Sequence, residues 1–323
     1  MGRALRRVLL AAAVAVLLVV AAVVVTGTHL AREVGRVPDA FTGLQHRPRG
    51  TDPVDVLLVG TYDAGGGATW LPDHGRPVSL MVVHLDGGGH GAAVVALPLT
   101  APVAVPGRGR RRLGSVFAMG GPSLAVGTVE RLTGTRIDHL AVVDWHVFER
   151  LVDVLGGLEL SVDPREVGRA TWRPRSATAY VDGDNLMDFV AEQPGVGPVA
   201  HLHRELIVLD ELMRGSLHQS MHKRPLQTYR FLDALASHLT VDDGWSPVAM
   251  GRVVVSLWNL RSADIRYATA PLTCPGPRSD RCRVALDRSA GPAFWEAVRG
   301  SRLDGWLVEH QLRGLANRTR VDP

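Results

Sequence analysis

The sequence predicts an α/β protein, because helical and strand patterns alternate along much of the chain. The alternation is clearest from Arg112 to Val162, where two helical patterns are each followed by a short apolar run that suits a buried strand. Hydrophobic residues make up 46% of the 323 residues, which is enough for a sizeable core. The chain has no internal repeat and no clear second domain, so we expect one large domain.

Three strands are expected before this central stretch, at Val54–Gly60, Ser79–Leu85 and Ala92–Leu97. Each is a short apolar run bounded by Gly, Pro or polar residues, as in buried strands. Residues 26–53 are interpreted as a linker, since they contain three prolines and show little periodicity. The Pro- and Arg-rich segment Pro98–Leu113 is expected to be a loop.

The central stretch predicts two helices, each followed by a strand. Gly120-Gly121-Pro122 breaks the chain and starts a helix with its proline at the first helical position. Gly134 ends that helix, because glycine adopts the left-handed cap without strain. A strand at Ile137–Val143, a helix at Trp145–Leu155 and a strand at Leu158–Val162 follow.

The second half of the chain is mainly helical in pattern. A polar loop is expected at 164–182, and residues 54–215 are taken as the core of the domain. Residues 216–323 are taken as its C-terminal part and a basic tail. The elements expected after the loop are helices at Asp184–Ala191, Val199–Met213, Leu226–Leu239, Pro247–Leu257 and Ala293–Arg299, and a strand at Ile265–Ala270.

Residues 8–25 form an unbroken apolar run near the start of the chain. At 1.5 Å per residue a helix of this length spans roughly 27 Å, just enough to cross a bilayer core. Arg3, Arg6 and Arg7 precede the run, which predicts that residues 1–7 stay in the cytoplasm and that the main domain lies outside. A cleaved signal peptide is the alternative, but the residues that follow offer no clear cleavage site. We therefore expect an uncleaved single-pass anchor in the cell membrane.

The two cysteines, Cys274 and Cys282, enclose a short loop that contains proline. Outside the cytoplasm they are free to form a disulfide, which would contribute roughly 2–3 kcal/mol on the chain-entropy model. Two cysteines with no histidine between them are poor candidates for a metal site.

The charge of the chain favours acidic partners. The calculated pI is about 9.6 and the net charge is +4, which suits phosphates, anionic lipid headgroups or anionic polymers. No nucleic acid is expected as a partner, because the chain carries no zinc finger, RNA-binding signature or basic recognition helix. The densest cationic cluster is Gly107–Arg112, which is either a phosphate-binding loop or a solvated loop drawn to an anionic membrane.

Other motifs carry little chemistry. The glycine triplets at 65–67 and 87–89 match neither phosphate-binding fingerprint. The pair His218 and His222 has zinc spacing but lacks the other ligands, so these histidines, with His201 and His203, are expected to be exposed. The side chains of Asp63, Asp86 and Asp144 each follow a predicted strand, where α/β folds place ligands.

Several segments resemble motifs of one protein family. VLLVGTYD, GRPVSLMVVHLD, ALPLTAPVAVPG, RLGSVFAMGGP and the block from TVERLTG to LGGLELSV are similar to the LytR-CpsA-Psr (LCP) family of membrane-anchored bacterial cell-wall enzymes. The resemblance implies an α/β/α sandwich with a central mixed sheet, preceded by one transmembrane helix. It also implies transfer of a glycopolymer from a polyprenyl pyrophosphate carrier to peptidoglycan, with carboxylates holding Mg²⁺ against the pyrophosphate and arginines neutralising it.

The resemblance assigns roles to four residues of this chain. Asp63 matches a metal-binding Asp, and Arg76, Arg112 and Arg204 match cationic positions around the pyrophosphate. Other motif positions depart from the family's charged or polar residues, namely Val78, Ser79, Leu99, Thr100, Gly114, Ala191, Gln193, Pro198, His201 and Glu205.

The scaffold therefore matches better than the site. The leading hypothesis is a degenerate LCP protein that binds a polyprenyl phosphate lipid or wall glycopolymer, or that partners an active LCP relative. The second is an active transferase with a divergent Mg²⁺-dependent site, in which Asp63 binds the metal and Arg76, Arg112 and Arg204 bind the pyrophosphate. The sequence alone does not decide whether Arg108, Arg110 and Arg111 replace the missing arginines. The third is a structural module of the envelope without a ligand.

Overall fold

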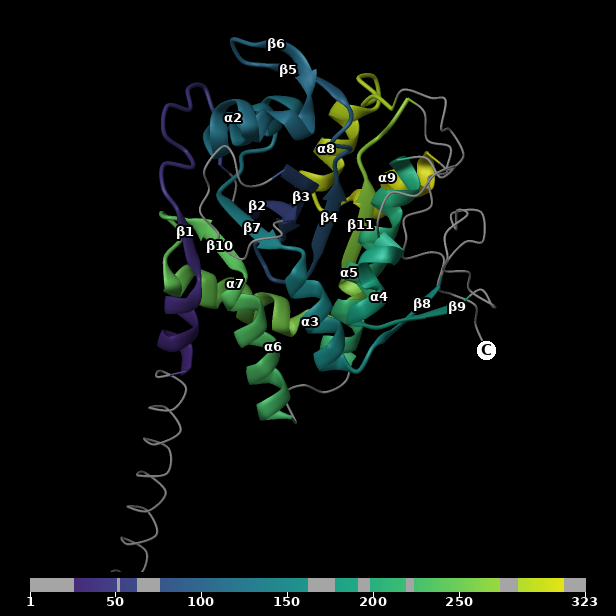
Figure 1. Cartoon of the computed structure of the whole chain (residues 1–323). Coiled ribbons are helices and arrows are strands. Elements are labelled where there is room, and N and C mark those ends of the chain that lie inside the picture. Colours follow the sequence, from purple (N-terminus) through teal and green to yellow (C-terminus); the bar gives the residue numbers. More distant parts are fainter. Residues whose placement is uncertain are drawn as a thin grey trace, which may run out of the picture.

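A seven-stranded mixed sheet forms the centre of the protein in the computed structural model (Figure 1). The structure describes residues 26–50, 53–62, 76–161, 178–190, 198–218, 224–273 and 284–310. The predicted membrane segment 8–25, Asp63 and both cysteines lie outside the described residues. Among the helices that are described, none combines the length and apolarity needed to cross a membrane.

The strand order explains the mixed character of the sheet. It runs β1, β10, β7, β2, β3, β4, β11, with parallel pairing for β1–β10, β7–β2 and β4–β11 and antiparallel pairing at the other three contacts. The strands are β1 (Gly35–Val37), β2 (Val54–Tyr62), β3 (Arg76–Leu85), β4 (Ala92–Ala96), β7 (His139–Asp144), β10 (Leu239–Asp242) and β11 (Ile265–Thr269).

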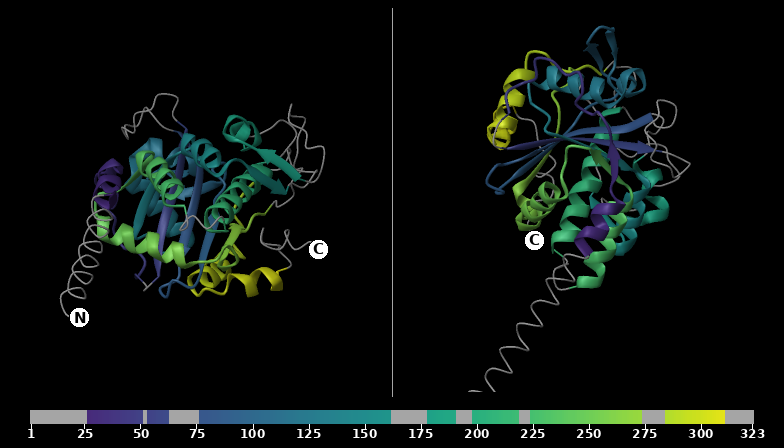
Figure 2. Two further views of the ribbon diagram at one scale, coloured as in Figure 1. Left: turned by 90° about the horizontal axis from the view of Figure 1, so that it is seen from below. Right: turned by 90° about the vertical axis from the view of Figure 1, so that its left-hand side faces the viewer.

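Helices cover both faces of the sheet and make a three-layer sandwich (Figure 2). One face carries α2 (Val116–Thr133), α8 (Gly291–Arg299) and α9 (Leu303–Glu309). The other carries α3 (His146–Leu155), α4 (Gly183–Val190), α5 (Pro198–His218), α6 (Pro225–Ser237) and α7 (Pro247–Asn259). The expected α/β class with a central mixed sheet is thus confirmed.

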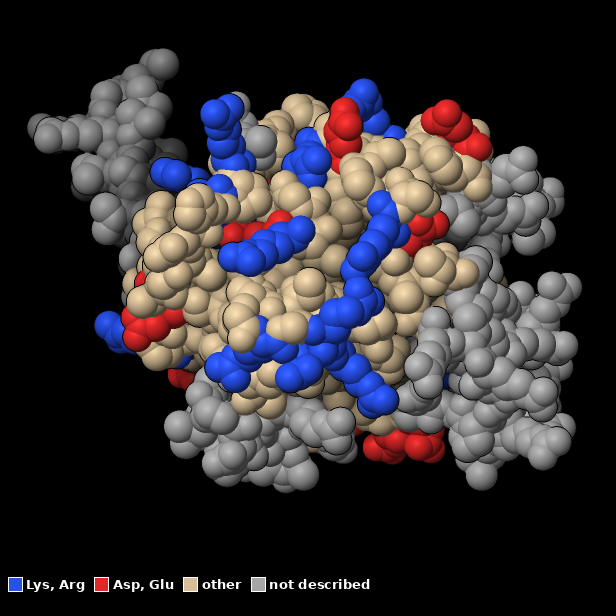
Figure 3. Space-filling model, turned by 90° about the horizontal axis from the view of Figure 1, so that it is seen from above, with Lys and Arg blue, Asp and Glu red and all other residues tan. Residues whose placement is uncertain are grey.

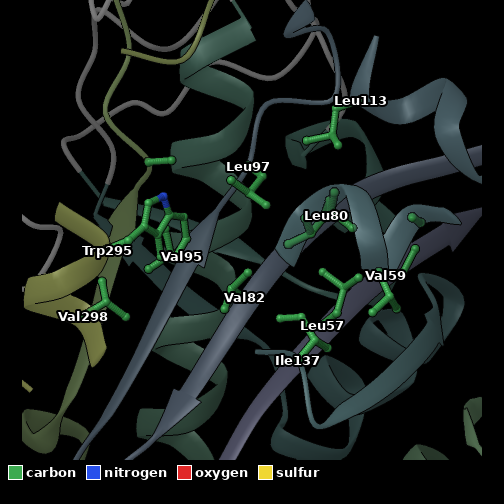
Figure 4. Close-up of a cluster of buried hydrophobic side chains, with 14 of the residues drawn as sticks. Leu57, Val59, Leu80, Val82, Val95, Leu97, Leu113, Ile137, Trp295 and Val298 are labelled. Carbon is green, nitrogen blue, oxygen red and sulfur yellow. The ribbon is translucent and has the colours of Figure 1, made fainter. Parts of the chain in front are cut away.

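Alternation along the strands builds two cores. Leu80 and Val82 of β3 pack toward α2 and α8, with Val298 in the same cluster (Figure 4). Met81, between them, packs with the helices on the opposite face. Successive side chains of a strand point to opposite faces, so β3 supplies both cores and is buried on both sides.

Most predicted elements of the central stretch are present. Gly134 caps α2 with φ 65°, and Gly156 caps α3 with φ 84°, both in the left-handed conformation that favours glycine. The helix before Gly134 begins earlier than predicted, at Val116, and is kinked where Gly120 and Gly121 leave helical geometry. The predicted break is thus confirmed, since a helical segment starts at Pro122 after it, but another helical segment, beginning at Val116, precedes it.

Four predictions about irregular segments were wrong. The linker 26–53 contains helical residues 26–33 and strand β1. The loop Pro98–Leu113 is a hairpin of β5 (Pro102–Val105) and β6 (Gly109–Arg112), followed by the 3₁₀ turn Leu113–Ser115. The loop 164–182 ends in β9 (Thr178–Val181), which pairs with β8 (Leu158–Ser161). The segment between the helices predicted at Leu226–Leu239 and Pro247–Leu257, where no strand was predicted, contains β10 (Leu239–Asp242). Short strands with Pro or Arg lack the apolar alternation that identifies a strand in sequence.

Candidate functional site

One edge of the sheet gathers the segments that carry the LCP-like motifs. Strands β2 and β7 are parallel and end together, since Thr61 pairs with Asp144, and β3 begins there because Arg76 pairs with Tyr62. The chain leaving β4 reaches the same edge, where the Leu97 amide donates to the Leu80 carbonyl at 2.8 Å. We call this the motif edge.

Two of the three strand-end carboxylates singled out in the sequence, Asp86 and Asp144, are not brought together, and the third, Asp63, lies outside the described residues. Asp144 lies at the motif edge, at the end of β7. Asp86 follows antiparallel β3, whose last residue, Leu85, pairs with Val54 at the start of β2. Asp86 therefore lies at the opposite edge of the sheet and cannot share a ligand with Asp144.

Gly60, Ser79 and Trp145 pack tightly together near the motif edge. The Trp145 indole Nε1 donates to Ser79 Oγ at 3.3 Å, and the backbone amide of Trp145 donates to the Thr61 carbonyl at 2.9 Å. Gly60 pairs with Ser79 across the strands, and a Cβ on Gly60 would lie 2.1 Å from Ser79 Oγ and 2.4 Å from Trp145 Nε1. Only glycine fits here, so the indole and hydroxyl pack directly over the backbone of β2.

Helix α5 brings a histidine–glutamate pair to this region. His201 Nε2 lies 3.1 Å from Glu205 Oε1, one helical turn away, and His201 Nδ1 lies 2.7 Å from the Val190 carbonyl at the end of α4. The Glu205 side chain is fully buried, and that of His201 is 22% exposed. The expectation that His201 is exposed was therefore wrong, because the ring is enclosed between α4, α5 and β3.

This environment makes His201 a cation. Burial by itself lowers the pKa of an imidazole, but contact with Glu205, the charge of that carboxylate and the carbonyls of Val190 and Val78 outweigh it and raise the pKa of His201 to about 9. Burial raises the pKa of Glu205, while the neighbouring charges of His201 and Arg204 oppose that rise. Near neutral pH His201 is protonated, with Nδ1 within hydrogen-bond distance of the Val190 carbonyl and Nε2 within ion-pair distance of Glu205.

The candidate pyrophosphate-binding arginines are not brought together. Arg204 is 2% exposed and lies on α5. Arg112 is exposed at the end of β6, next to the turn that packs with α2 on the other face of the sheet. Arg76 begins β3 at the motif edge, but its side chain is outside the described part of the structure.

The described residues do not fit the Mg²⁺ site that the resemblance implies. Such a site needs several oxygen ligands, mainly carboxylates. At the motif positions that the structure describes, Val78 and Thr100 stand where carboxylates are expected, and Asp63 lies outside the described residues. Over the whole described part of the chain, no three His, Cys, Asp or Glu side chains are close enough to hold a metal ion.

The fold and the motif edge define a three-layer α/β domain of the LCP type. The LytR_cpsA_psr family model matches residues 27–242, which is most of the chain. The protein therefore belongs to the LytR-CpsA-Psr family.

Curated relatives match over shorter spans. The probable cell wall biosynthesis protein LcpB of Corynebacterium glutamicum is 26% identical over 172 residues, which is 53% of this chain and 41% of LcpB. The polyisoprenyl-teichoic acid–peptidoglycan teichoic acid transferase TagU of Bacillus mycoides is 29% identical over 114 residues, or 35% of this chain and 36% of TagU. The matched regions thus span well under half the length of these relatives.

Solved structures confirm the fold. TagV of B. subtilis superposes with a TM-score of 0.58 at 17% identity, covering 79% of this chain and 99% of TagV. The LytR-Csp2A-Psr enzyme from Actinomyces oris gives 0.58 at 16% identity, covering 84% and 95% of the two chains. At these identities the likeness establishes the fold alone.

Sequence reasoning missed several contacts between a histidine and a buried carboxylate, including His201–Glu205 and His84–Asp55. The i, i+4 spacing of His201 and Glu205 was visible but was outweighed by the polar look of the segment. The second pair is His84 and Asp55, whose Nδ1 and Oδ1 atoms lie 2.8 Å apart across β2 and β3. The signal for it is one polar residue in each of two otherwise apolar strands, VDVLLVG and SLMVVHL.

Proposed function

We propose that this protein is a membrane-anchored, extracytoplasmic LCP protein of cell-envelope biogenesis that binds a polyprenyl phosphate-linked glycopolymer and transfers it weakly or not at all. Relatives that share its domain support the ligand class, since TagU is named for teichoic acid transfer to peptidoglycan and a TagT structure contains LI-WTA. The apolar run at 8–25, with arginines before it, supports the anchor.

The observation that carries the proposal is the His201–Glu205 pair. In the family motif the position of His201 is an arginine that faces pyrophosphate. Here the cation at this position is directed at Glu205 and at the Val190 carbonyl. A phosphate would have to displace a buried carboxylate from its partner, and breaking a buried ion pair is costly.

Uncharged residues at the neighbouring motif positions also support weak or absent transfer. Phosphoryl transfer depends mainly on positioning and on charge stabilisation of the transferred group. Leu99 and Thr100 carry no charge, and Arg112 is exposed on the side of the sheet opposite Arg204. The arrangement retains the scaffold for a lipid-linked ligand but few of the charges that would stabilise its transfer.

Binding of a short-chain polyprenyl pyrophosphate to the full-length protein in detergent, with and without Mg²⁺, tests this proposal. We expect binding that is insensitive to Mg²⁺ and no transfer to peptidoglycan fragments. Tight Mg²⁺-dependent binding that is abolished by Asp63→Ala and Arg204→Ala would favour an active transferase with a divergent site. Absence of any binding would favour a structural module of the envelope.

A further inference from the structure

The β5–β6 hairpin carries four arginines with no acidic neighbour in the surrounding sequence. Arg108, Arg110, Arg111 and Arg112 are all exposed, and residues 87–129 contain neither Asp nor Glu. Within the described residues none of the four forms an ion pair, their recorded side-chain hydrogen bonds being those of Arg110 and Arg111 to backbone carbonyls of the hairpin itself. We call these four residues the arginine hairpin. Within the described residues, the positive charges of the arginine hairpin are therefore not neutralised by acidic side chains.

The pairing of the hairpin explains why its arginines are presented to solvent. Val103 and Val105 of β5 are buried against the core, and they anchor the hairpin on the α2 side of the sheet. Strand β6 pairs only with β5, so all four of its residues stay exposed. Arg110 and Arg112 are two residues apart on one side of this strand, about 6.6 Å along it. Each guanidinium can therefore engage a different group of an extended anionic chain.

A groove beside the hairpin extends the cationic surface. It has a volume of about 410 Å³ and lies between α2, residues 43–48 and the β5–β6 turn, with Arg108 and Arg131 in its lining. The acidic residue in this lining, Glu130, is 3% exposed and already neutralised by Arg47 at 2.8 Å. Figure 3, which looks onto this end of the molecule, shows cationic side chains gathered in a band across the face.

We propose that the arginine hairpin and this groove bind the repeating phosphodiesters of an anionic glycopolymer, outside the site at the motif edge. Guanidinium groups suit phosphate because their planar forks donate two parallel hydrogen bonds. Several exposed charges at regular spacing suit a repeating polyanion, whose binding releases counterions at every contact. The inference rests on the proposed function, because it assumes that the ligand is an envelope polymer.

The position of the hairpin favours a polymer over a membrane surface. Figure 1 places β5 and β6 at the top of the molecule and helical residues 26–33 at the lower left, near the opposite end. A chain anchored through the residues before 26 holds its nearest end toward the bilayer. The arginine hairpin then faces away from the lipid and toward the wall.

The test is binding of a fluorescent glycerol phosphate oligomer to the full-length protein in neutral detergent at several salt concentrations. In the variant Arg108→Gln/Arg110→Gln/Arg111→Gln we expect affinity to fall about tenfold, and the slope of log affinity against log salt to become shallower by about two. The matched control is Arg32→Gln/Arg230→Gln/Arg252→Gln, which removes the same charge from exposed residues on other elements and should change affinity less than twofold. Equal losses in both triple variants, or no loss in the hairpin variant, would overturn the proposal.

Two competitors identify what the hairpin recognises. Inorganic phosphate should displace the oligomer only at far higher concentration, because it makes one contact rather than several. Micelles containing phosphatidylglycerol should compete weakly, and competition equal to that of the oligomer per charge would make this a membrane contact instead. Binding of polyprenyl pyrophosphate should be the same in the hairpin variant as in the wild type. Failure of the hairpin proposal is therefore distinguishable from failure of the proposed function.

Discussion

Two buried histidine–carboxylate pairs are built in different ways in this molecule. His84 and Asp55 face each other across β3 and β2 as register partners, with exposed fractions of 1% and 2%. His201 and Glu205 lie one turn apart on the single helix α5, and His201 remains 22% exposed. The first pair joins two strands, whereas the second holds its partners on one element and depends on α4 and β3 to enclose it.

The two contacts lie in different parts of the molecule: one joins strands of the fold, and the other lies among the motif residues of the candidate site. The His84–Asp55 pair lies near the edge opposite the LCP motifs, and a slip of one residue between β2 and β3 would separate it. His201 and Glu205 stand at motif positions, where the resemblance to the family led us to expect an arginine and a glutamine. The same kind of contact thus joins two strands in one place and lies within the candidate site in the other.

The largest loss of stability on substitution is expected from breaking the strand pair. Asp55→Val removes the partner that lies 2.8 Å from the buried His84 Nδ1, and leaving a buried polar group without its hydrogen-bond partner costs about 1–3 kcal/mol. The free energy of unfolding from urea denaturation measures this loss. The double variant Asp55→Val/His84→Val should recover most of it, because well-packed apolar residues often replace a buried pair at little cost. A double variant as unstable as the single one would show that the instability does not come from leaving His84 without its hydrogen-bond partner.

The helix pair should produce a pH dependence of stability. The pKa of His201 is about 9 in the folded protein and about 6.5 in the unfolded chain, so its stabilisation is complete below pH 6.5 and is lost as the pH rises through 9. We expect the free energy of unfolding to fall over this range by up to about 3 kcal/mol. Melting temperatures between pH 6 and 9.5 measure the slope.

Glu205→Gln is the variant that isolates this effect. It keeps the shape of the side chain, removes the charge that stabilises the imidazolium, and should abolish most of the slope between pH 6.5 and 9. His146→Gln is the matched control, because His146 also pairs with a glutamate on its own helix, at 3.1 Å, but is more exposed. A wild-type protein whose stability is flat over this range would contradict the assignment of a charged His201.

The smallest expected loss of stability comes from removing the uncharged hydrogen bond between Trp145 and Ser79. Ser79→Ala removes the acceptor of the Trp145 indole, a bond of 3.3 Å, and should cost about 1 kcal/mol. Ser79→Thr is the comparison, since it keeps the hydroxyl but adds a methyl group beside Gly60. Chemical denaturation resolves both values. If Ser79→Ala lowered the free energy of unfolding as much as Asp55→Val, the Trp145–Ser79 contact would stabilise β3 as strongly as the His84–Asp55 contact does.

Strong apolar patterns made much of the fold predictable. The strands β2, β3, β4 and β7 and the caps Gly134 and Gly156 follow from short apolar runs and from glycine's access to positive φ. Strands β1, β5, β6, β9 and β10 were missed. The sequences of β1, β5 and β6 carry Gly, Pro or Arg, and β9 and β10 are only four residues long, so the pairing of all five is decided by tertiary partners. Long-range pairing cannot be derived from local pattern.

The candidate site was predictable as a set of positions but not as a set of contacts. The family motifs identified Arg76, Arg204 and the segment after β4 as candidate positions, and in the structure Arg76 and the segment after β4 lie at the motif edge, whereas Arg204 lies on α5. They did not reveal that Arg112 would lie exposed on the α2 side, or that His201 would be paired with Glu205. Charge pairing depends on burial and on side-chain direction, which sequence spacing does not fix.

Strand β1 forms a mechanically weak connection between the N-terminal segment and the rest of the sheet. It is three residues long, lies at the margin of the sheet beside β10, and is further held by Arg36, whose guanidinium donates to the carbonyls of Asp242 and Trp245 at 3.2 and 2.6 Å. Tension applied to the chain before residue 26 reaches the domain through this short strand. Under load β1 is expected to peel away first, leaving the other six strands in register and lengthening the reach of the domain without unfolding it.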